Sequence, residues 1–180
     1  MIWLIIIAAI VLVLLVVVYY INKIQILSNQ IENSWAQIEV QLQRRAELIP
    51  NLVNTVKGYA KHEREVFENV TNARSQLLKA SGRAEKIRAS DQLTTALKSL
   101  FAVAENYPEL KANQNFLALQ EELTNTENKI AYARQFYNDA VLSYNNIITT
   151  IPGMWFAFGR KPKEYLEAPK GEEAPPKVEF

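Results

Sequence analysis

Apolar and small residues recur every three or four positions between residues 116 and 151, without a break. An α-helix completes a turn in about 3.6 residues, so this coiled-coil-like spacing places them along one face of one long helix. The face is expected to carry Phe116, Leu119, Leu123, Thr126, Ile130, Ala133, Tyr137, Ala140, Tyr144, Ile147 and Ile151. We call this row the 116–151 seam. Because an apolar face of that length needs cover, the seam predicts partner helices.

A different pattern opens the chain, where residues 2–21 form a continuous apolar run without a charged side chain. At ~1.5 Å of rise per residue the run is long enough to cross the ~30 Å hydrocarbon core of a bilayer, which predicts a transmembrane anchor. Aromatic rings at both ends suit the headgroup level. The residues that mark the anchor are Ile2, Trp3, Leu12, Tyr19, Tyr20 and Ile21. A cleaved signal peptide fits less well, because no basic residue precedes the run and no small-residue cleavage site follows it.

Helical spacing continues after the anchor, which is therefore expected to lead into one helix. The spaced positions are Leu27, Ile31, Ser34, Ile38 and Leu42. Pro50 is the first interruption. A proline ring removes a backbone donor and clashes with the carbonyl four residues back, so Pro50 either ends this helix or kinks it.

Two further helices are expected before the seam. One covers about residues 51–81 and stops at Ser81-Gly82, where glycine favours a helix end. The next covers about residues 84–105 and stops before Pro108. Beyond residue 159 the chain carries four prolines among alternating charges, a composition that predicts a mobile tail.

The chain is therefore predicted to be all-α, with an N-terminal transmembrane helix continuing into an antiparallel up-and-down four-helix bundle and a disordered C-terminal tail. The expected parts are an anchor over residues 1–21, a bundle over 22–159 and a tail over 160–180. If Pro50 is a turn, the first two helices are each ~42 to 46 Å long, and the second returns to the membrane.

That return brings basic residues and an aromatic stretch to the bilayer surface, where anionic headgroups attract cations and aromatic rings are favoured. The candidate lipid-facing residues are Lys23, Lys79, Arg83, Lys86, Arg88, Met154, Trp155, Phe156, Phe158, Arg160 and Lys161. The alternative is that the basic residues are solvated and the aromatic residues cap the core. A kink at Pro50, instead of a turn, would remove the membrane placement.

Composition argues against most chemistry. The 20 Lys and Arg residues balance 19 Asp and Glu residues, so the chain lacks the basic field of a general nucleic-acid binder. It has no cysteine, and its five glycines do not form a phosphate-binding loop. His62 is the single histidine, and Tyr59 stands where a di-iron bundle would need glutamate. We expect no cofactor, no metal, no small-molecule substrate and no enzymatic activity.

Polar residues beside the seam are interpreted as contacts that fix helix register. Glu127 and Arg134 flank the seam, and one of them is expected to form a partly buried ion pair with the first helix, through Arg44 or Glu47. The seam tyrosines need partners for their hydroxyl groups. Because Asn138 and Asn145 stand beside those tyrosines, a polar ligand pocket is the alternative.

Three stretches of sequence, at residues 33–35, 37–63 and 106–145, resemble the LemA family of bacterial membrane proteins. The resemblance covers nearly the whole chain before the tail. It implies a single N-terminal membrane span and a cytoplasmic up-and-down four-helix domain, and it supports treating Pro50 as a boundary. It brings no established enzymatic activity and no catalytic residues.

Basic residues follow the anchor at Lys23, Arg44 and Arg45, and none precedes it. Since such residues stay on the cytoplasmic side, the N-terminus is expected outside the cell membrane and the body in the cytoplasm.

We expect a non-enzymatic structural scaffold, a homo-oligomer that self-assembles at the bilayer through leftover apolar residues such as Val53, Phe67 and Leu117. The alternative for these residues is that they widen the core of a single molecule. The alternative is a membrane-tethered adaptor that recruits a protein partner through its bundle or its tail.

Overall fold

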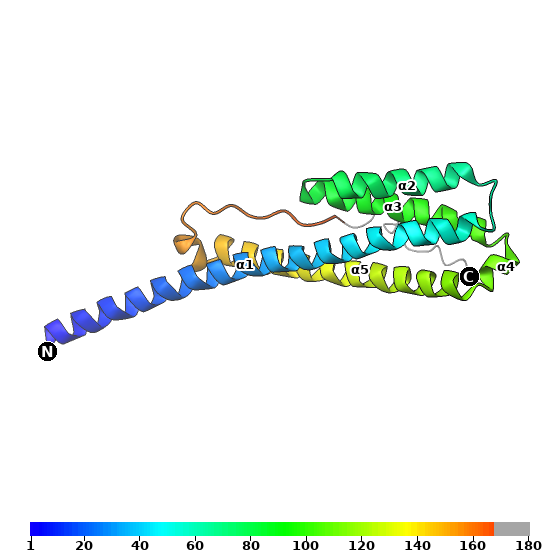
Figure 1. Ribbon diagram of the computed structural model, residues 1–180. Helices are drawn as coiled ribbons and strands as arrows, with labels where there is room; N and C mark the ends of the chain where they lie inside the picture. Colours follow the sequence, from blue (N-terminus) through cyan, green and yellow to red (C-terminus); the bar gives the residue numbers. More distant parts are fainter. Residues whose placement is uncertain (168–180) are drawn as a thin grey trace, which may run out of the picture. The chain divides into compact units, whose positions relative to one another are not determined.

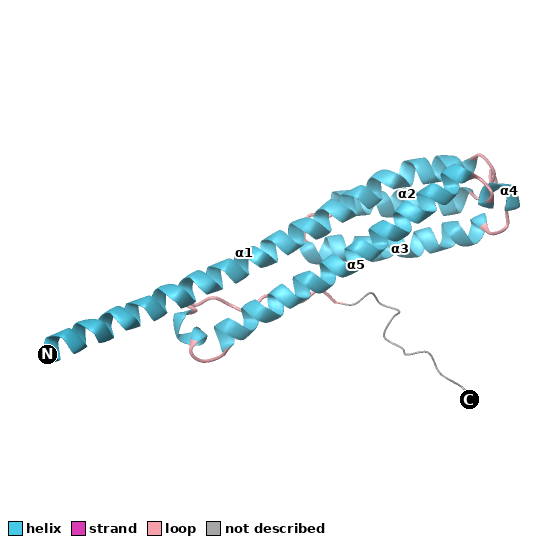
Figure 2. Ribbon diagram, turned by 90° about the horizontal axis from the view of Figure 1, so that it is seen from below, coloured by secondary structure: helices cyan, strands magenta, loops and turns pink. Residues whose placement is uncertain are grey.

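Helices make up the regular secondary structure in the computed structural model, which describes residues 1–167 (Figures 1 and 2). In chain order the elements are α1 (Ile2–Lys57), α2 (Arg64–Lys79), α3 (Arg83–Ala104), α4 (Pro108–Lys111), α5 (Gln114–Thr149) and η1 (Gly153–Phe156), a turn of 3-10 helix. The described residues contain no strand, so the all-α prediction is confirmed for them. The up-and-down four-helix bundle stays a prediction.

α1 passes through Pro50 without ending, so the expected boundary at this proline is wrong. The helix tolerates the lost backbone donor because Pro50 itself is exposed, while apolar residues on both sides of it are buried. Ile49, Leu52 and Val56 are each no more than 1% exposed. Packing of this apolar face therefore outweighs the local penalty of the proline.

The second helix is consequently shorter than expected. α2 begins at Arg64 instead of residue 51 and has 16 residues, ~24 Å of rise. The helix that was to carry Lys79, Arg83, Lys86 and Arg88 back to the bilayer is thus about half the expected length. Lys86 instead forms an ion pair with Glu39 of α1, which lies 18 positions after Ile21, ~27 Å along the helix. The bilayer placement of these four residues no longer follows.

Contacts divide the chain into two units that share α1 and α5. Of the described residues, unit 1 contains 1–37 and 133–165, and unit 2 contains 38–132 together with 166 and 167. The expected ends of the anchor and the bundle at residues 21 and 159 stay predictions. No break occurs at residue 21, because α1 continues through it as predicted.

The 116–151 seam is buried along most of α5. Leu123, Ile130, Tyr137 and Tyr144 are each only 3–4% exposed. The prediction that Ile151 belongs to the buried seam is wrong, since this residue is 67% exposed. The helix ends at Thr149, two residues before Ile151, and the next buried position after Tyr144 is Ile148.

Within unit 2, α2 and α3 lie side by side, joined by a short loop through Gly82 (Figures 1 and 2). Val70 of α2 and Leu93 and Leu100 of α3 are fully buried. Val53 and Phe67, which were expected to serve neighbouring molecules, are 5% and 4% exposed and lie in the core. Leu117 is 48% exposed and stays a candidate for such a contact.

Candidate functional site

The first part of α1 exposes apolar side chains on every side. Residues 1–16 are all exposed, and Trp3 and Leu12 are 77% and 63% exposed. This stretch is long and apolar enough to cross a membrane, and none of its most apolar part is buried within the protein. A helix that is apolar all round suits a lipid environment better than water, which indicates a membrane protein.

A small aromatic and cationic cluster ends the apolar run. The Tyr19 and Tyr20 rings meet edge to face, with 5.2 Å between their centroids. The Lys23 ammonium donates a hydrogen bond to the Tyr19 hydroxyl at 3.2 Å and lies 5.5 Å from that ring's centroid. Amphipathic rings and a long cationic side chain are favoured at the boundary between hydrocarbon and headgroups.

The chain returns to this same end of the run after α5. The Phe156 ring of η1 stacks on Tyr20, with 5.2 Å between centroids and 15° between ring planes. Gly153 allows η1 to approach the end of α5, because a Cβ there would lie 2.1 Å from the Ile147 carbonyl oxygen. We call residues 151–158 the aromatic turn. It leaves Met154, Trp155 and Phe158 47%, 65% and 70% exposed.

The first residues after the aromatic turn are attached to α5. Asn145 donates its amide N–H to the Lys163 carbonyl at 2.9 Å and accepts the Lys163 N–H at 2.8 Å. The Tyr137 hydroxyl donates to the Glu164 carbonyl at 3.5 Å, so one seam tyrosine has its partner. The Asn145 amide therefore binds the protein's own backbone. Residues 160–167 contain no helix or strand, and residues 168–180 of the expected tail lie outside the described part.

Unit 2 holds a buried polar cluster around Arg45, which is 3% exposed. Its guanidinium lies 2.8 Å from the Glu127 carboxylate and donates to the Thr94 hydroxyl at 2.9 Å and the Ser90 hydroxyl at 3.4 Å. Burial lowers the pKa of Arg45, and the negative charges of Glu127 and Asp91 oppose that shift. The cluster joins α1, α3 and α5.

The expected ion pair between Glu127 and the first helix is confirmed, but its partner is Arg45. Arg44, the predicted partner, instead lies 2.5 Å from Glu122. Neighbouring helix positions differ by about 100° in direction, so a shift of one residue exchanges an exposed side chain for a buried one. Each arginine neutralises a glutamate of α5. Ion pairs of this kind fix the register of the helices, and they leave these carboxylates less suited to a catalytic role.

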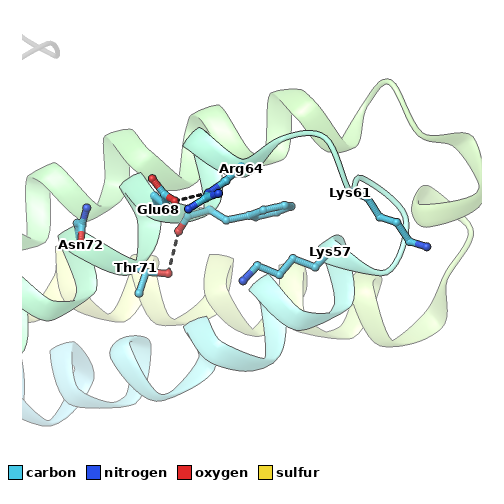
Figure 3. A pocket seen from close by; sticks show the side chains of 7 residues that line it. Lys57, Lys61, Arg64, Glu68, Thr71 and Asn72 are labelled. Carbon is cyan, nitrogen blue, oxygen red and sulfur yellow. Dashed lines mark hydrogen bonds and ion pairs between the residues drawn. The ribbon is translucent and has the colours of Figure 1, made fainter.

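An open pocket in unit 2 was not predicted from the sequence (Figure 3). It is lined by Lys57, Lys61, Arg64, Phe67, Glu68, Thr71 and Asn72. The turn after α1 brings Lys57 to within 5.5 Å of the Phe67 ring centroid, and Arg64 pairs with Glu68 at 2.7 Å. Three cations against one carboxylate favour an anionic group here. Sequence spacing gave no signal, because the pocket forms only where the turn joins two helices.

No cluster of three or more metal-ligating side chains occurs in residues 1–167. The glutamates beside the seam are engaged elsewhere, since Glu122 and Glu127 pair with arginines. His62 is exposed in the turn between α1 and α2. Within residues 1–167, these glutamates therefore serve as ion-pair partners of arginines.

Comparison with known proteins gives one family and several relatives. The model of the LemA family matches residues 34–180. The proteins named Magnetosome protein MamQ 1 and MamQ 2 from Paramagnetospirillum magneticum are each 28% identical over 180 positions, covering 84% of this chain and 66% of theirs. Protein LemA from Metamycoplasma hominis is 26% identical over 130 positions, covering 72% of this chain and 59% of its own. The chain thus spans slightly less than two thirds of these relatives.

Proposed function

This chain belongs to the LemA family, and from that premise we propose a non-enzymatic structural protein that one N-terminal helix holds in the cell membrane and that self-assembles there. The observation that carries the proposal is the exposed apolar run of α1, which continues without interruption into a helix with a buried face. A single helix that serves both lipid and core ties the rest of the protein to the bilayer.

The surface that we assign to self-assembly is an aromatic pair on α5. Tyr132 and Phe136 are 65% and 64% exposed, and their spacing of four residues places them on one helix face. Isolated exposed apolar residues are ordinary, but two adjacent large rings form a patch suited to a partner. Copies held in one membrane meet at a raised effective concentration, which favours a second copy of this chain as that partner.

Size measurements on the full chain in detergent and in lipid nanodiscs test self-assembly. We expect discrete oligomers, and we expect Tyr132→Ser with Phe136→Ser to reduce them to monomers. Leu142→Ser is the matched control, because Leu142 is 48% exposed on another face of α5 and should leave the assembly unchanged. Monomer mass for the unaltered chain at all concentrations would rule out self-assembly.

We further propose that the N-terminus lies outside and the body lies in the cytoplasm, because the basic residue Lys23 directly follows the apolar run. The chain has no cysteine, so single substitutions give clean reporters. In intact spheroplasts an impermeant maleimide should label Ile2→Cys and spare Lys98→Cys, whose position is exposed in unit 2. The opposite labelling pattern would reverse the orientation.

An adaptor is the second candidate, and the basic pocket of Figure 3 is the observation that favours it. Its cations suit an acidic segment of a cytoplasmic partner. Replacing Lys57 and Lys61 by glutamine, or deleting residues 168–180, would separate the two candidates. Loss of partner capture with assembly intact favours the adaptor, and unchanged partners favour the scaffold.

A further inference from the structure

The aromatic turn exposes large apolar side chains beside the end of the apolar run. The stack of Phe156 on Tyr20 fixes η1 at the last residues of that run. From there Trp155 and Phe158 extend with 65% and 70% of their surfaces exposed. In water such a group of rings would be an unfavourable surface, whereas aromatic rings are favoured at the headgroup boundary of a bilayer.

The charged residues that come first after the aromatic turn are basic. Residues 1–31 and 140–163 contain no Asp or Glu. They contain Lys23, Arg160, Lys161 and Lys163, three of which directly follow the aromatic turn. Apolar rings next to basic residues match the two layers that an anionic membrane surface offers, acyl chains and negatively charged headgroups.

The backbone at the end of the aromatic turn is in an unusual conformation. Phe158 has φ of 45° and Gly159 has φ of 75°. The left-handed region is unfavourable for a bulky residue, and Phe158 occupies it while its ring faces outward. No contact with the protein's own core accounts for that conformation, since the ring is 70% exposed.

We propose that residues 151–161 form a second membrane contact, in which Trp155 and Phe158 enter the headgroup boundary of the bilayer that α1 crosses. Arg160 and Lys161 bind its anionic headgroups. The inference rests on the proposed membrane span. It adds that the end of α5 also rests on lipid, so that the membrane holds the protein at two places far apart in sequence.

Depth-dependent fluorescence quenching tests the contact in the full chain. The protein has three tryptophans, so Trp3→Phe with Trp35→Phe leaves Trp155 as the single reporter. In nanodiscs, lipids brominated near the headgroup end of the acyl chain should quench Trp155 several-fold more than lipids brominated near the bilayer centre. A reporter at position 132, made by Tyr132→Trp in a chain with Trp3, Trp35 and Trp155 replaced by Phe, is the control and should not be quenched.

The failures of the two proposals are distinguishable with Trp3 as the single reporter. Quenching of Trp3 without quenching of Trp155 overturns the second contact and leaves the span standing. If neither is quenched, the span itself fails. Shielding of Trp155 from acrylamide without quenching by brominated lipid would mean that a second copy covers the turn, which also overturns the proposal.

Energy transfer from Trp155 to a dansyl-labelled anionic lipid tests the basic residues. Arg160→Gln with Lys161→Gln should lower the transfer several-fold, to the level seen with a dansyl-labelled zwitterionic lipid. Lys79→Gln with Arg83→Gln removes two cations from unit 2 and should leave the transfer unchanged. Equal transfer in both variants would contradict a headgroup site at Arg160 and Lys161.

Discussion

The two units differ in which side chains they bury and which they expose. Unit 2 buries Arg45 and pairs it with Glu127, and it places Val53 and Phe67 in its core. Unit 1 exposes the first 16 residues of α1 and the rings of Trp155 and Phe158. The first arrangement suits water outside and a packed interior, whereas the second suits lipid outside. Exposure alone therefore does not describe a side chain's environment in this protein.

The sharpest test of that difference uses two equally exposed positions on one helix. Leu12 and Val40 are 63% and 62% exposed, in units 1 and 2 respectively. Leu12→Arg should cost about 3 kcal/mol of membrane insertion, because it places a charge within the hydrocarbon. Val40→Arg should change little, within about 0.5 kcal/mol.

Membrane fractionation with alkaline extraction measures the first effect, and chemical unfolding in detergent measures the second. Equal behaviour of the two variants would erase the distinction between the units.

Removing one member of the buried ion pair should have the next largest effect. Glu127→Ala leaves Arg45 buried without its carboxylate, and we expect a loss of about 2 kcal/mol in the free energy of unfolding. This is below the usual cost of breaking a buried pair, because the Glu127 side chain is 44% exposed and water screens the charge in part.

Glu122→Ala is the matched control, since its pair with Arg44 is half-exposed and should contribute at most about 1 kcal/mol. Denaturant unfolding followed by circular dichroism compares the two. An equal loss in both variants would contradict the role assigned to burial.

Two glycines provide a smaller contrast. Gly153→Ala should destabilise the aromatic turn by about 1 kcal/mol, because the added Cβ meets the Ile147 backbone and the turn must shift away. Gly82→Ala meets nothing within 4 Å and should be neutral or stabilising. Loss of lipid quenching at Trp155 reports the first change, and thermal unfolding reports the second. An unaltered turn in Gly153→Ala would show that its approach to α5 is looser than described.

The smallest expected effect is a pH dependence at the start of α3. Glu85 accepts hydrogen bonds from the Ser81 backbone N–H at 3.1 Å and the Ser81 hydroxyl at 3.4 Å, and these hold the pKa of its carboxyl below the usual value of 4.5. A lowered folded pKa means stability that is present above the unfolded pKa and lost as pH falls through the folded one. Glu85→Gln should flatten this part of the stability curve between neutral and acid pH. A curve identical to that of the unaltered chain would exclude the contribution.

The sequence predicted features that depend on repeated spacing. The buried face of α5 and the apolar run of α1 follow from period and length, and both are present. The sequence left open whether Pro50 ends the helix or kinks it, because a local rule could not weigh the burial of Ile49 and Leu52 on either side. The choice between Arg44 and Arg45 depends on helix rotation, which spacing does not fix.

Features made by turns were least predictable. The pocket at Lys57 and Arg64 depends on where α1 ends, and the alternative of a turn at Pro50 would have ended α1 seven residues before Lys57. The aromatic turn was a candidate from composition, but its stack on Tyr20 needed the structure. The stack joins residues 136 positions apart, and no local pattern encodes it.

The stack of Phe156 on Tyr20 joins the two ends of unit 1 at one point. A chain segment that is loose before association must be ordered when a partner binds, at an entropic cost. Because the stack already orders η1 against one side of α1, the proposed association of two copies would not have to order this segment.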